Sequence, residues 1–273
     1  DAPSMLGLSD HDALATAFAA IALEAGAAVM AVYAGAFETR RKADKSPVSD
    51  ADEKAEAIIL EALARLLPGV PALAEEEASR AGVQAPPLSG DFLLVDPVDG
   101  TREFVERRDA FTVNIALVEA GLPTVGCLYA PALRQLFFSG RAAFAARDAA
   151  PGAALNEAAL APLRTREPPA GGLTALVSSS HANAETDAFL GRLRIAGRRP
   201  VASSLKFGLL ASGEADIYPR FGPTMEWDTA AGQAILTAAG GAVLAPDGSP
   251  FRYGKAESAY RNGPFIAWGR PPG

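Results

Sequence analysis

The hydrophobic pattern changes about halfway along the chain, and this change most constrains the fold. In the first half, the pattern predicts two helices and then strands, near 9–33, 49–67, 92–95, 111–119 and 124–130. In the second half, short strands alternate with helices near 183–194, 203–212 and 227–239. The stretch between the halves, 148–172, is rich in Ala, Pro and Gly. We therefore predict an α+β domain over 1–150 and an α/β domain over 151–273.

The first two helices have recognisable starts. Ser9 with Asp12, and Ser49 with Asp52, have the S-x-x-D spacing of a helix N-cap. The first helix is apolar, but its polar and small residues argue against a membrane span and favour a buried helix. The residues before it lack the basic and apolar segments of a signal peptide, so we expect a cytoplasmic protein.

Composition excludes several classes of function. The chain has 32 Asp and Glu against 25 Lys and Arg, a formal net charge of −7, and such an acidic surface repels nucleic-acid phosphates. The one cysteine, Cys127, rules out an internal disulfide and a cysteine-ligated zinc site. The two histidines, His11 and His181, rule out a multi-histidine metal centre. Carboxylates, the ligands of hard cations such as Mg²⁺, remain plentiful.

One short run combines the groups that a metal–phosphate site needs. In Asp96-Pro-Val-Asp99-Gly100-Thr101, two carboxylates follow a predicted strand, and then come a glycine, a hydroxyl and the amides of a predicted helix start. Carboxylates bind metals, while amides and hydroxyls bind phosphate oxygens. A capped turn with solvated acids is the alternative. Two further acidic groups, Glu75-Glu76-Glu77 after a predicted strand and Asp228 at a predicted helix start, favour the metal site. A charge run is usually a solvated face, however, and Asp228 would equally suit a helix N-cap.

These motifs together resemble the inositol monophosphatase superfamily of Mg²⁺-dependent, lithium-sensitive phosphatases. The resemblance rests on the glutamate pair, the run Asp96–Thr101 and Trp227-Asp-Thr-Ala-Ala-Gly232, and it extends over about 14–268. It implies a five-layer αβαβα sandwich of the inositol monophosphatase and fructose-1,6-bisphosphatase type. It also implies two or three Mg²⁺ ions, held by Glu75, Asp96, Asp99, Asp228 and the carbonyl of Val98. Glu76 would hold or deprotonate the attacking water, and Thr101 would share a proton network with Asp44.

Three further segments are similar to the CysQ-type 3′(2′),5′-bisphosphate nucleotidases: Ser178-Ser-Ser-His181, Ser203-Ser-Leu-Lys206 and Tyr218-Pro-Arg220. This similarity implies hydrolysis of the 3′-phosphate of adenosine 3′,5′-bisphosphate, or of its 5′-phosphosulfate form, by a metal-activated water. Gly100 and Thr101 would contact the phosphate that is cleaved, and His181 would lie near the nucleoside. The 5′-phosphate would be bound by Ser203, Ser204, Lys206 and Arg220.

The residues themselves support a second anion site but leave alternatives open. Lys206 on the first turn of a helix and Arg220 at a strand end supply cations, although each is also compatible with an ordinary surface position. Inositol phosphate or fructose bisphosphate would suit the same metal chemistry, and a non-catalytic metal- or nucleotide-binding module would suit the same acids. Inositol is less favoured, because Phe221 and Gly222 stand where inositol phosphatases carry a sugar-binding glutamate. We expect a monomer or homodimer with no nucleic-acid partner, no integral membrane segment and, at most, peripheral association with the inner face of a membrane.

Overall fold

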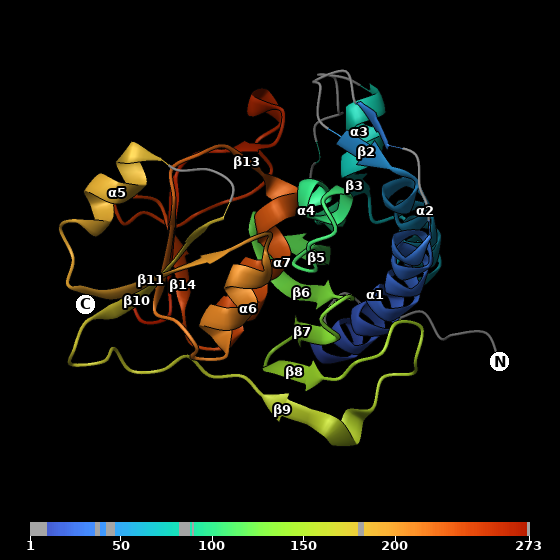
Figure 1. Cartoon of the computed structure of the whole chain (residues 1–273). Coiled ribbons are helices and arrows are strands. Elements are labelled where there is room, and N and C mark those ends of the chain that lie inside the picture. Colours follow the sequence, from blue (N-terminus) through green and yellow to red (C-terminus); the bar gives the residue numbers. More distant parts are fainter. Residues whose placement is uncertain are drawn as a thin grey trace.

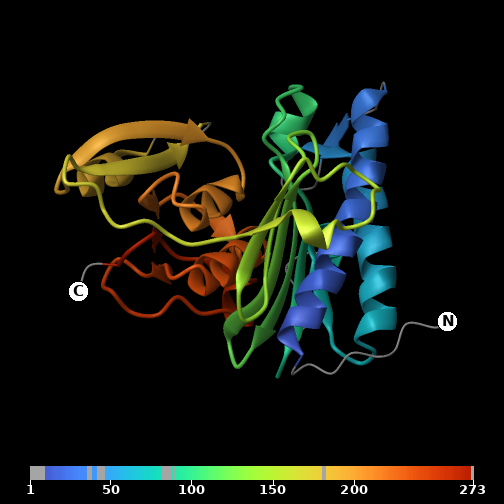
Figure 2. The same cartoon turned by 90° about the horizontal axis from the view of Figure 1, so that it is seen from below.

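The elements form five layers, in the order helices, sheet, helices, sheet, helix (Figures 1 and 2). This computed structural model describes residues 10–35, 39–41, 47–81, 88, 90–179 and 183–271. The layering confirms the predicted αβαβα sandwich. Its first layer is formed by α1 (His11–Ala34) and α2 (Asp50–Leu66), which pack against each other and against one face of the first sheet.

Helix α1 begins one residue later than its sequence pattern indicates. The N-cap is Asp10, whose carboxylate accepts a hydrogen bond from the backbone amide of Ala13; Ser9 lies outside the described residues. The helix is long and apolar enough to span a membrane, but 56% of its most apolar window is buried inside the protein. It packs on β6 and β7 and fills the core there, so α1 is a core helix in this fold.

The first sheet has seven strands in the order β3-β4-β5-β6-β7-β8-β9. Strands β3 and β4 are parallel, and every later pair is antiparallel. The predicted hairpin is confirmed, and its turn uses the positive φ of Ala120 (50°) and Gly121 (77°). The strands are β3 (Ala72–Ala74), β4 (Phe92–Asp99), β5 (Thr112–Glu119), β6 (Leu122–Ala130), β7 (Gln135–Ser139), β8 (Ala143–Arg147) and β9 (Leu160–Pro162).

The chain crosses to the second sheet after β9, within the stretch predicted to be a boundary. The second sheet has the order β11-β10-β12-β16-β14, in which β10 is parallel to β11 and β12, and β16 is antiparallel to β12 and β14. Its strands are β10 (Leu173–Ser178), β11 (Ile195–Val201), β12 (Ile217–Arg220), β14 (Ala242–Leu244) and β16 (Phe265–Trp268). The outer helix α5 (Ala184–Leu190) packs against β12 and ends before the predicted residue 194.

Helices α6 (Leu205–Ala211) and α7 (Glu226–Ala238) fill the layer between the two sheets. Helix α7 contacts β5 and β6 on one side and β14 on the other. It approaches β6 closely because position 126 is glycine: a Cβ there would lie 2.5 Å from the carbonyl oxygen of Ala231. The larger of the two main hydrophobic cores surrounds these helices, and the other lies between the first sheet and α1 and α2.

Short elements gather at one end of the layers, where β3 and β4 finish (Figure 1). Two of them, α3 (Glu75–Ala81) and α4 (Thr101–Val105), directly follow β3 and β4. Two small ribbons pair β1 (Thr39–Arg41) with β2 (Pro47–Ser49) and β13 (Thr224–Met225) with β15 (Arg261–Asn262). Single 3₁₀ turns at Glu157–Ala159 and Ala256–Ser258 complete the described elements. The sequence-predicted acids that the structure describes follow β3, end β4 or begin α7, and they therefore converge on this end of the fold.

Candidate active site

Three aspartates from two separate parts of the chain meet at this end. Asp96 and Asp99 stand at the end of β4, and Asp228 stands in the first turn of α7. One carboxylate oxygen from each lies within 4.8 Å of the others. Residues three apart on a regular strand point to opposite faces, but the register of β4 with β5 shifts between Asp96 and Asp99. That irregularity, at Pro97, allows both side chains to join the cluster.

Burial and mutual repulsion make the three carboxylates costly to ionise. Burial, followed by the charges of Glu75, Asp99 and Asp228, raises the pKa of Asp96 well above its usual range. Burial, followed by the charge of Asp99, does the same to the pKa of Asp228. Burial raises the pKa of Asp99 to about 6, although Lys206 and the Ser204 amide oppose the rise. A cluster of carboxylates that repel one another suits a hard divalent cation, because the charge of the cation would offset the repulsion.

Glu75 belongs to the same cluster through the sheet. It is the first residue of α3 and follows β3, whose Ala74 is paired in parallel with Val95 of β4. Its carboxyl group interacts with Asp96 by hydrogen bonding as well as by charge. The neighbouring carbonyl of Val98 accepts a hydrogen bond from the Thr101 hydroxyl (3.1 Å). The metal-binding roles of Glu75 and Val98 remain predictions.

Among the described residues, Asp52 is the acid that forms a hydrogen bond with the Thr101 hydroxyl. The Thr101 hydroxyl lies 3.3 Å from Asp52 Oδ1, and Asp52 is fully buried. Asp44, to which the sequence analysis gave this place, lies outside the described residues. Asp52 was not predicted for the site, because its spacing from Ser49 is that of a helix-capping pair. A usable signal was present, since Asp52 lies on the same buried helix face as Ala55, Ile59 and Leu63.

Helix α2 also supports the second glutamate of α3. Glu76 is 3% exposed, and its backbone amide donates a hydrogen bond to Oε2 of Glu56 on α2 (2.7 Å). Burial, together with the charge of Glu76, raises the pKa of Glu56 to about 7 although that amide bond and Arg80 lower it. Glu56 is a second functional candidate that the sequence analysis did not identify. The proposed role of Glu76 toward the attacking water remains a prediction.

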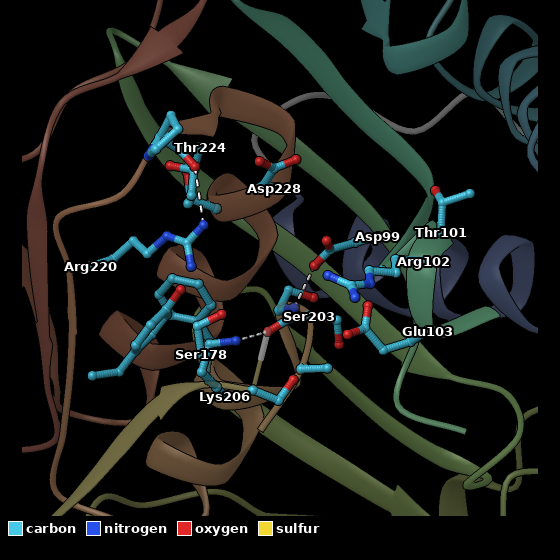
Figure 3. A pocket seen from close by; sticks show the side chains of 18 of the residues that line it. Asp99, Thr101, Arg102, Glu103, Ser178, Ser203, Lys206, Arg220, Thr224 and Asp228 are labelled. Carbon is cyan, nitrogen blue, oxygen red and sulfur yellow. Dashed lines mark hydrogen bonds between the residues drawn. The ribbon is translucent and has the colours of Figure 1, made fainter. Parts of the chain in front are cut away.

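A cavity of about 390 Å³ opens beside the carboxylates (Figure 3). It is lined by most of the residues that the sequence predicted for the site, and also by Glu103, which the sequence analysis did not single out. His181, predicted near the nucleoside, lies outside the described residues. The predicted site residues in the lining are Glu75, Asp99, Gly100, Thr101, Ser203, Ser204, Lys206, Arg220 and Asp228.

Both the hydroxyl and the amide of Ser204 form hydrogen bonds with other residues of the protein. Its hydroxyl donates to Asn114 Oδ1 (2.7 Å) and lies 2.7 Å from Thr112 Oγ1, and Asn114 Nδ2 donates back to Thr112 (3.3 Å). The Ser204 amide donates to Asp99 Oδ2. Helix α6 begins at Leu205, and Ser203 before it has a positive φ of 54°. Ser204 thus positions Asp99. Its contact with the 5′-phosphate of the substrate remains a prediction.

Hydrogen bonds to backbone carbonyls hold both predicted cations in place. Lys206 is 3% exposed; its ammonium donates to the carbonyls of Ser203 (2.6 Å) and Val201 (3.0 Å) and lies 4.8 Å from the ring centre of Tyr218. Burial lowers its pKa to about 8, against the attraction of Asp99. Arg220 ends β12, and its guanidinium donates to the carbonyls of Gly222 and Pro223. Burial of Lys206 contradicts its interpretation as an ordinary surface cation.

Glu226, next to the metal-site aspartate in sequence, has a different task. Its fully buried carboxylate accepts hydrogen bonds from the amides of Gly254 and Lys255 and pairs with the Lys255 ammonium at 2.9 Å. These contacts fix the loop after β14 to α7. Glu226 is therefore not arranged to bind the hydroxyl groups of a sugar substrate.

The layered fold and its carboxylate cluster define the family. The family model described as "Inositol monophosphatase family" matches residues 10–268, and the chain belongs to this family. Within it, the chain is 41% identical to the 3′(2′),5′-bisphosphate nucleotidase CysQ of Salmonella typhimurium over 244 residues, which cover 87% of this chain and 93% of that protein. The family resemblance seen in the sequence is confirmed.

Solved structures agree with this placement. The crystal structure of CysQ from Bacteroides thetaiotaomicron, a bacterial member of the family, matches with a TM-score of 0.77 and 32% identity, covering 97% of this chain and 100% of that one. An inositol monophosphatase from Anabaena matches with a TM-score of 0.71 and 25% identity, covering 95% and 91%. Both proteins therefore share the layered fold described above.

Proposed function

We propose that this chain is a metal-dependent 3′(2′),5′-bisphosphate nucleotidase. It removes the 3′-phosphate of adenosine 3′,5′-bisphosphate to give AMP, or of the 5′-phosphosulfate form to give adenosine 5′-phosphosulfate. One observation carries the proposal: a single cavity has carboxylates for cations on one side and the basic side chains of Lys206 and Arg220 on another (Figure 3). A bisphosphate presents two anions and needs both kinds of site.

The carboxylates would hold the metal, with Glu75, Asp96, Asp99 and Asp228 and the Val98 carbonyl as ligands. Mg²⁺ bound there lowers the pKa of a water ligand and neutralises phosphoryl charge. The chain itself would hold the proton of the attacking water through Thr101 and Asp52, with Glu76 nearby. Gly100 lets substrate approach the backbone, because its φ of 90° suits glycine and a Cβ would lie 3.4 Å from Ser203.

The basic side of the cavity would take the 5′-phosphate. Arg220 offers a planar donor fork suited to phosphate oxygens, and Lys206 offers a point charge behind Ser203. Both cations donate hydrogen bonds to backbone carbonyls, and phosphate oxygens would take the place of these acceptors. A substrate with one phosphate would leave this side of the cavity unused.

The proposal extends to conditions and assembly. We expect roughly two to three Mg²⁺ ions during turnover, as in multi-metal phosphatases, and inhibition by Li⁺. The protein acts as a monomer or homodimer on a small nucleotide, in the cytoplasm or at the inner face of a membrane. Residues 1–150 supply most of the metal ligands, and 151–273 supply Asp228 and the basic residues.

A substrate panel tests the proposal. Phosphate release is measured with Mg²⁺, with and without Li⁺, from adenosine 3′,5′-bisphosphate, inositol 1-phosphate and fructose 1,6-bisphosphate. The nucleotide should be preferred by kcat/KM, and Asp99→Asn should remove turnover of all substrates. Asp148→Asn, an 80% exposed acid paired with Arg134, is the matched control and should behave as wild type.

Each alternative has its own outcome in this panel. Preference for either sugar phosphate would replace the nucleotidase proposal by the other phosphatase activity. Nucleotide binding by calorimetry without any phosphate release would instead indicate a non-catalytic binding module. Normal turnover by Asp99→Asn would refute the metal site itself.

A further inference from the structure

Helix α2 carries two buried acids on its inner face, one helical turn apart. The first, Asp52, contacts Thr101 at the start of α4. The second, Glu56, is 2% exposed and contacts α3. Buried carboxylates are costly, so each is expected to be matched by specific partners. Those partners identify what Glu56 holds in place.

Glu56 supplies a helix cap that the local sequence lacks. The residue before α3 is Ala74, whose side chain cannot accept a hydrogen bond, yet the first amides of any helix have no partner within that helix. Glu56 Oε2 accepts the hydrogen bond from the Glu76 amide at 2.7 Å. An acceptor from another helix thus replaces the missing N-cap side chain.

The same carboxylate also contacts the far end of α3. Its other oxygen, Oε1, lies 3.2 Å from Nη2 of Arg80, in the last turn. Glu76 and Arg80 are four residues apart and so lie on one face of the helix. Contacts to two points along one face fix the rotation of α3 about its axis. Glu75 projects about 100° away from Glu76 on such a helix, so this rotation determines where Glu75 points.

We propose that Glu56 is a positioning residue, which fixes α3 through Glu76 and Arg80 so that the Glu75 carboxylate faces Asp96. The inference rests on the proposed metal site, because its consequence is a metal affinity. Partners that orient metal ligands typically contribute 10–100-fold to metal affinity or activity. Loss of Glu56 should therefore weaken metal binding while leaving the basic side of the cavity, and with it nucleotide affinity, unchanged.

Mn²⁺ binding, measured by electron paramagnetic resonance of the free ion, tests this inference without relying on turnover. The main variant is Glu56→Met, which keeps the volume and helix propensity but removes both acceptors. We expect Mn²⁺ affinity to fall about tenfold or more, with the KM for adenosine 3′,5′-bisphosphate at saturating Mg²⁺ within about twofold of wild type. Glu56→Gln keeps an acceptor for the Glu76 amide and should recover most of the affinity.

Two further variants complete the test. Glu61→Gln makes the same chemical change on an exposed part of α2, where the acid pairs with Arg65, and should leave Mn²⁺ affinity unchanged. Arg80→Gln removes only the outer contact of an exposed arginine, so it should fold even if Glu56→Met does not, and should weaken Mn²⁺ binding about threefold. Unchanged affinity in Arg80→Gln and in any folded Glu56→Met would overturn the inference. Absence of Mn²⁺ binding by the wild-type protein would instead contradict the proposed function.

Discussion

At the scale of single residues, one hydrogen bond assigns an acid to the candidate proton network. Within the part of the chain that the structure describes, two acceptors lie within reach of the Thr101 hydroxyl, the Val98 carbonyl at 3.1 Å and Asp52 Oδ1 at 3.3 Å. Only the carboxylate can take up a proton. Asp52 is fully buried, so this proton would be shielded from bulk water.

We expect Asp52→Asn to lower kcat by at least about 10²-fold with little change in KM, since general-base assistance contributes on this scale. The amide retains the size of the side chain but cannot accept the proton. Steady-state kinetics at saturating Mg²⁺ measure the effect, with circular dichroism to verify folding. Asp44→Asn is the comparison variant: if it lost more activity than Asp52→Asn, the acid predicted from the sequence would hold the role.

Lys206 is buried and Arg220 is half-buried, and their substitution should affect different substrates. Arg220→Met should raise the KM for adenosine 3′,5′-bisphosphate by roughly tenfold or more, the value of a charged hydrogen bond, but change the KM for 3′-AMP little. Lys206→Met should impair both substrates, because its ammonium also holds the Val201 and Ser203 carbonyls beside the Asp99 contact. Arg199→Met, an exposed cation paired with Glu214, controls for loss of charge. An equal effect of Arg220→Met on both substrates would indicate a structural role instead.

At the scale of elements, sequence periodicity predicts those parts in which local pattern and burial agree. The hairpin of β5 and β6 and helix α7 follow from apolar runs and turn residues. Strand β11 was missed because it is an exposed edge strand with a glycine, two arginines and a proline, Gly197 to Pro200, and so lacks alternation. Strand β4 was predicted to end at Val95, because a proline at position 97 normally ends pairing, yet it continues across an irregular register to Asp99.

The residues of the candidate site likewise divide into those that local sequence pattern predicts and those that it does not. Motif residues that follow a strand or begin a helix, such as Asp99 and Asp228, could be found from the sequence. The helical pattern places Asp52 and Glu56 on the buried face of α2, but their partners could not be predicted, because α2 reaches α3 and α4 only through tertiary packing. The sequence pattern marks α2 as amphipathic but does not say which elements its buried acids will face.

The close approach of α7 to β6 gives a prediction at this scale. In Gly126→Ala, the new methyl group would meet the Ala231 carbonyl, a backbone atom that can move only with the helix. We expect a loss of about 1–3 kcal/mol in the free energy of unfolding, measured by urea denaturation, and a higher Mg²⁺ requirement because α7 carries Asp228. Gly197→Ala, at a position with no atom within 4 Å of the new Cβ, should leave both unchanged. Wild-type stability in Gly126→Ala would show that α7 and β6 can separate enough to accommodate the methyl group.

At the scale of the whole molecule, the site exists only where the layers meet. The first sheet presents Asp96 and Asp99, the central layer presents Asp228 and Lys206, and the second sheet presents Arg220. The contacts that join these layers must also withstand the repulsion between the buried acids. Metal binding and global stability should therefore be linked, and this linkage depends on pH.

The sign of this linkage follows from the raised carboxylate pKa values. In the metal-free protein, Asp99 has a pKa of about 6 and those of Asp96 and Asp228 are also raised, so between about pH 4 and 6 the folded state binds more protons than the unfolded state. These groups consequently make the metal-free protein less stable as pH rises through that range. Mg²⁺ binds the ionised carboxylates, so its stabilising effect should increase with pH.

Thermal melting with Mg²⁺ and with EDTA, at about pH 5 and about pH 7.5, measures this effect. The increase in Tm caused by Mg²⁺ should be larger at the higher pH in the wild-type protein. It should be nearly absent at both pH values in Asp99→Asn, which removes one repelling charge and one ligand together. The same variant should melt at a higher temperature than the wild type in EDTA at the higher pH, because the repulsion is relieved. If EDTA-treated wild type were instead the more stable of the two, the buried carboxylates would not be opposing the fold as their raised pKa values require.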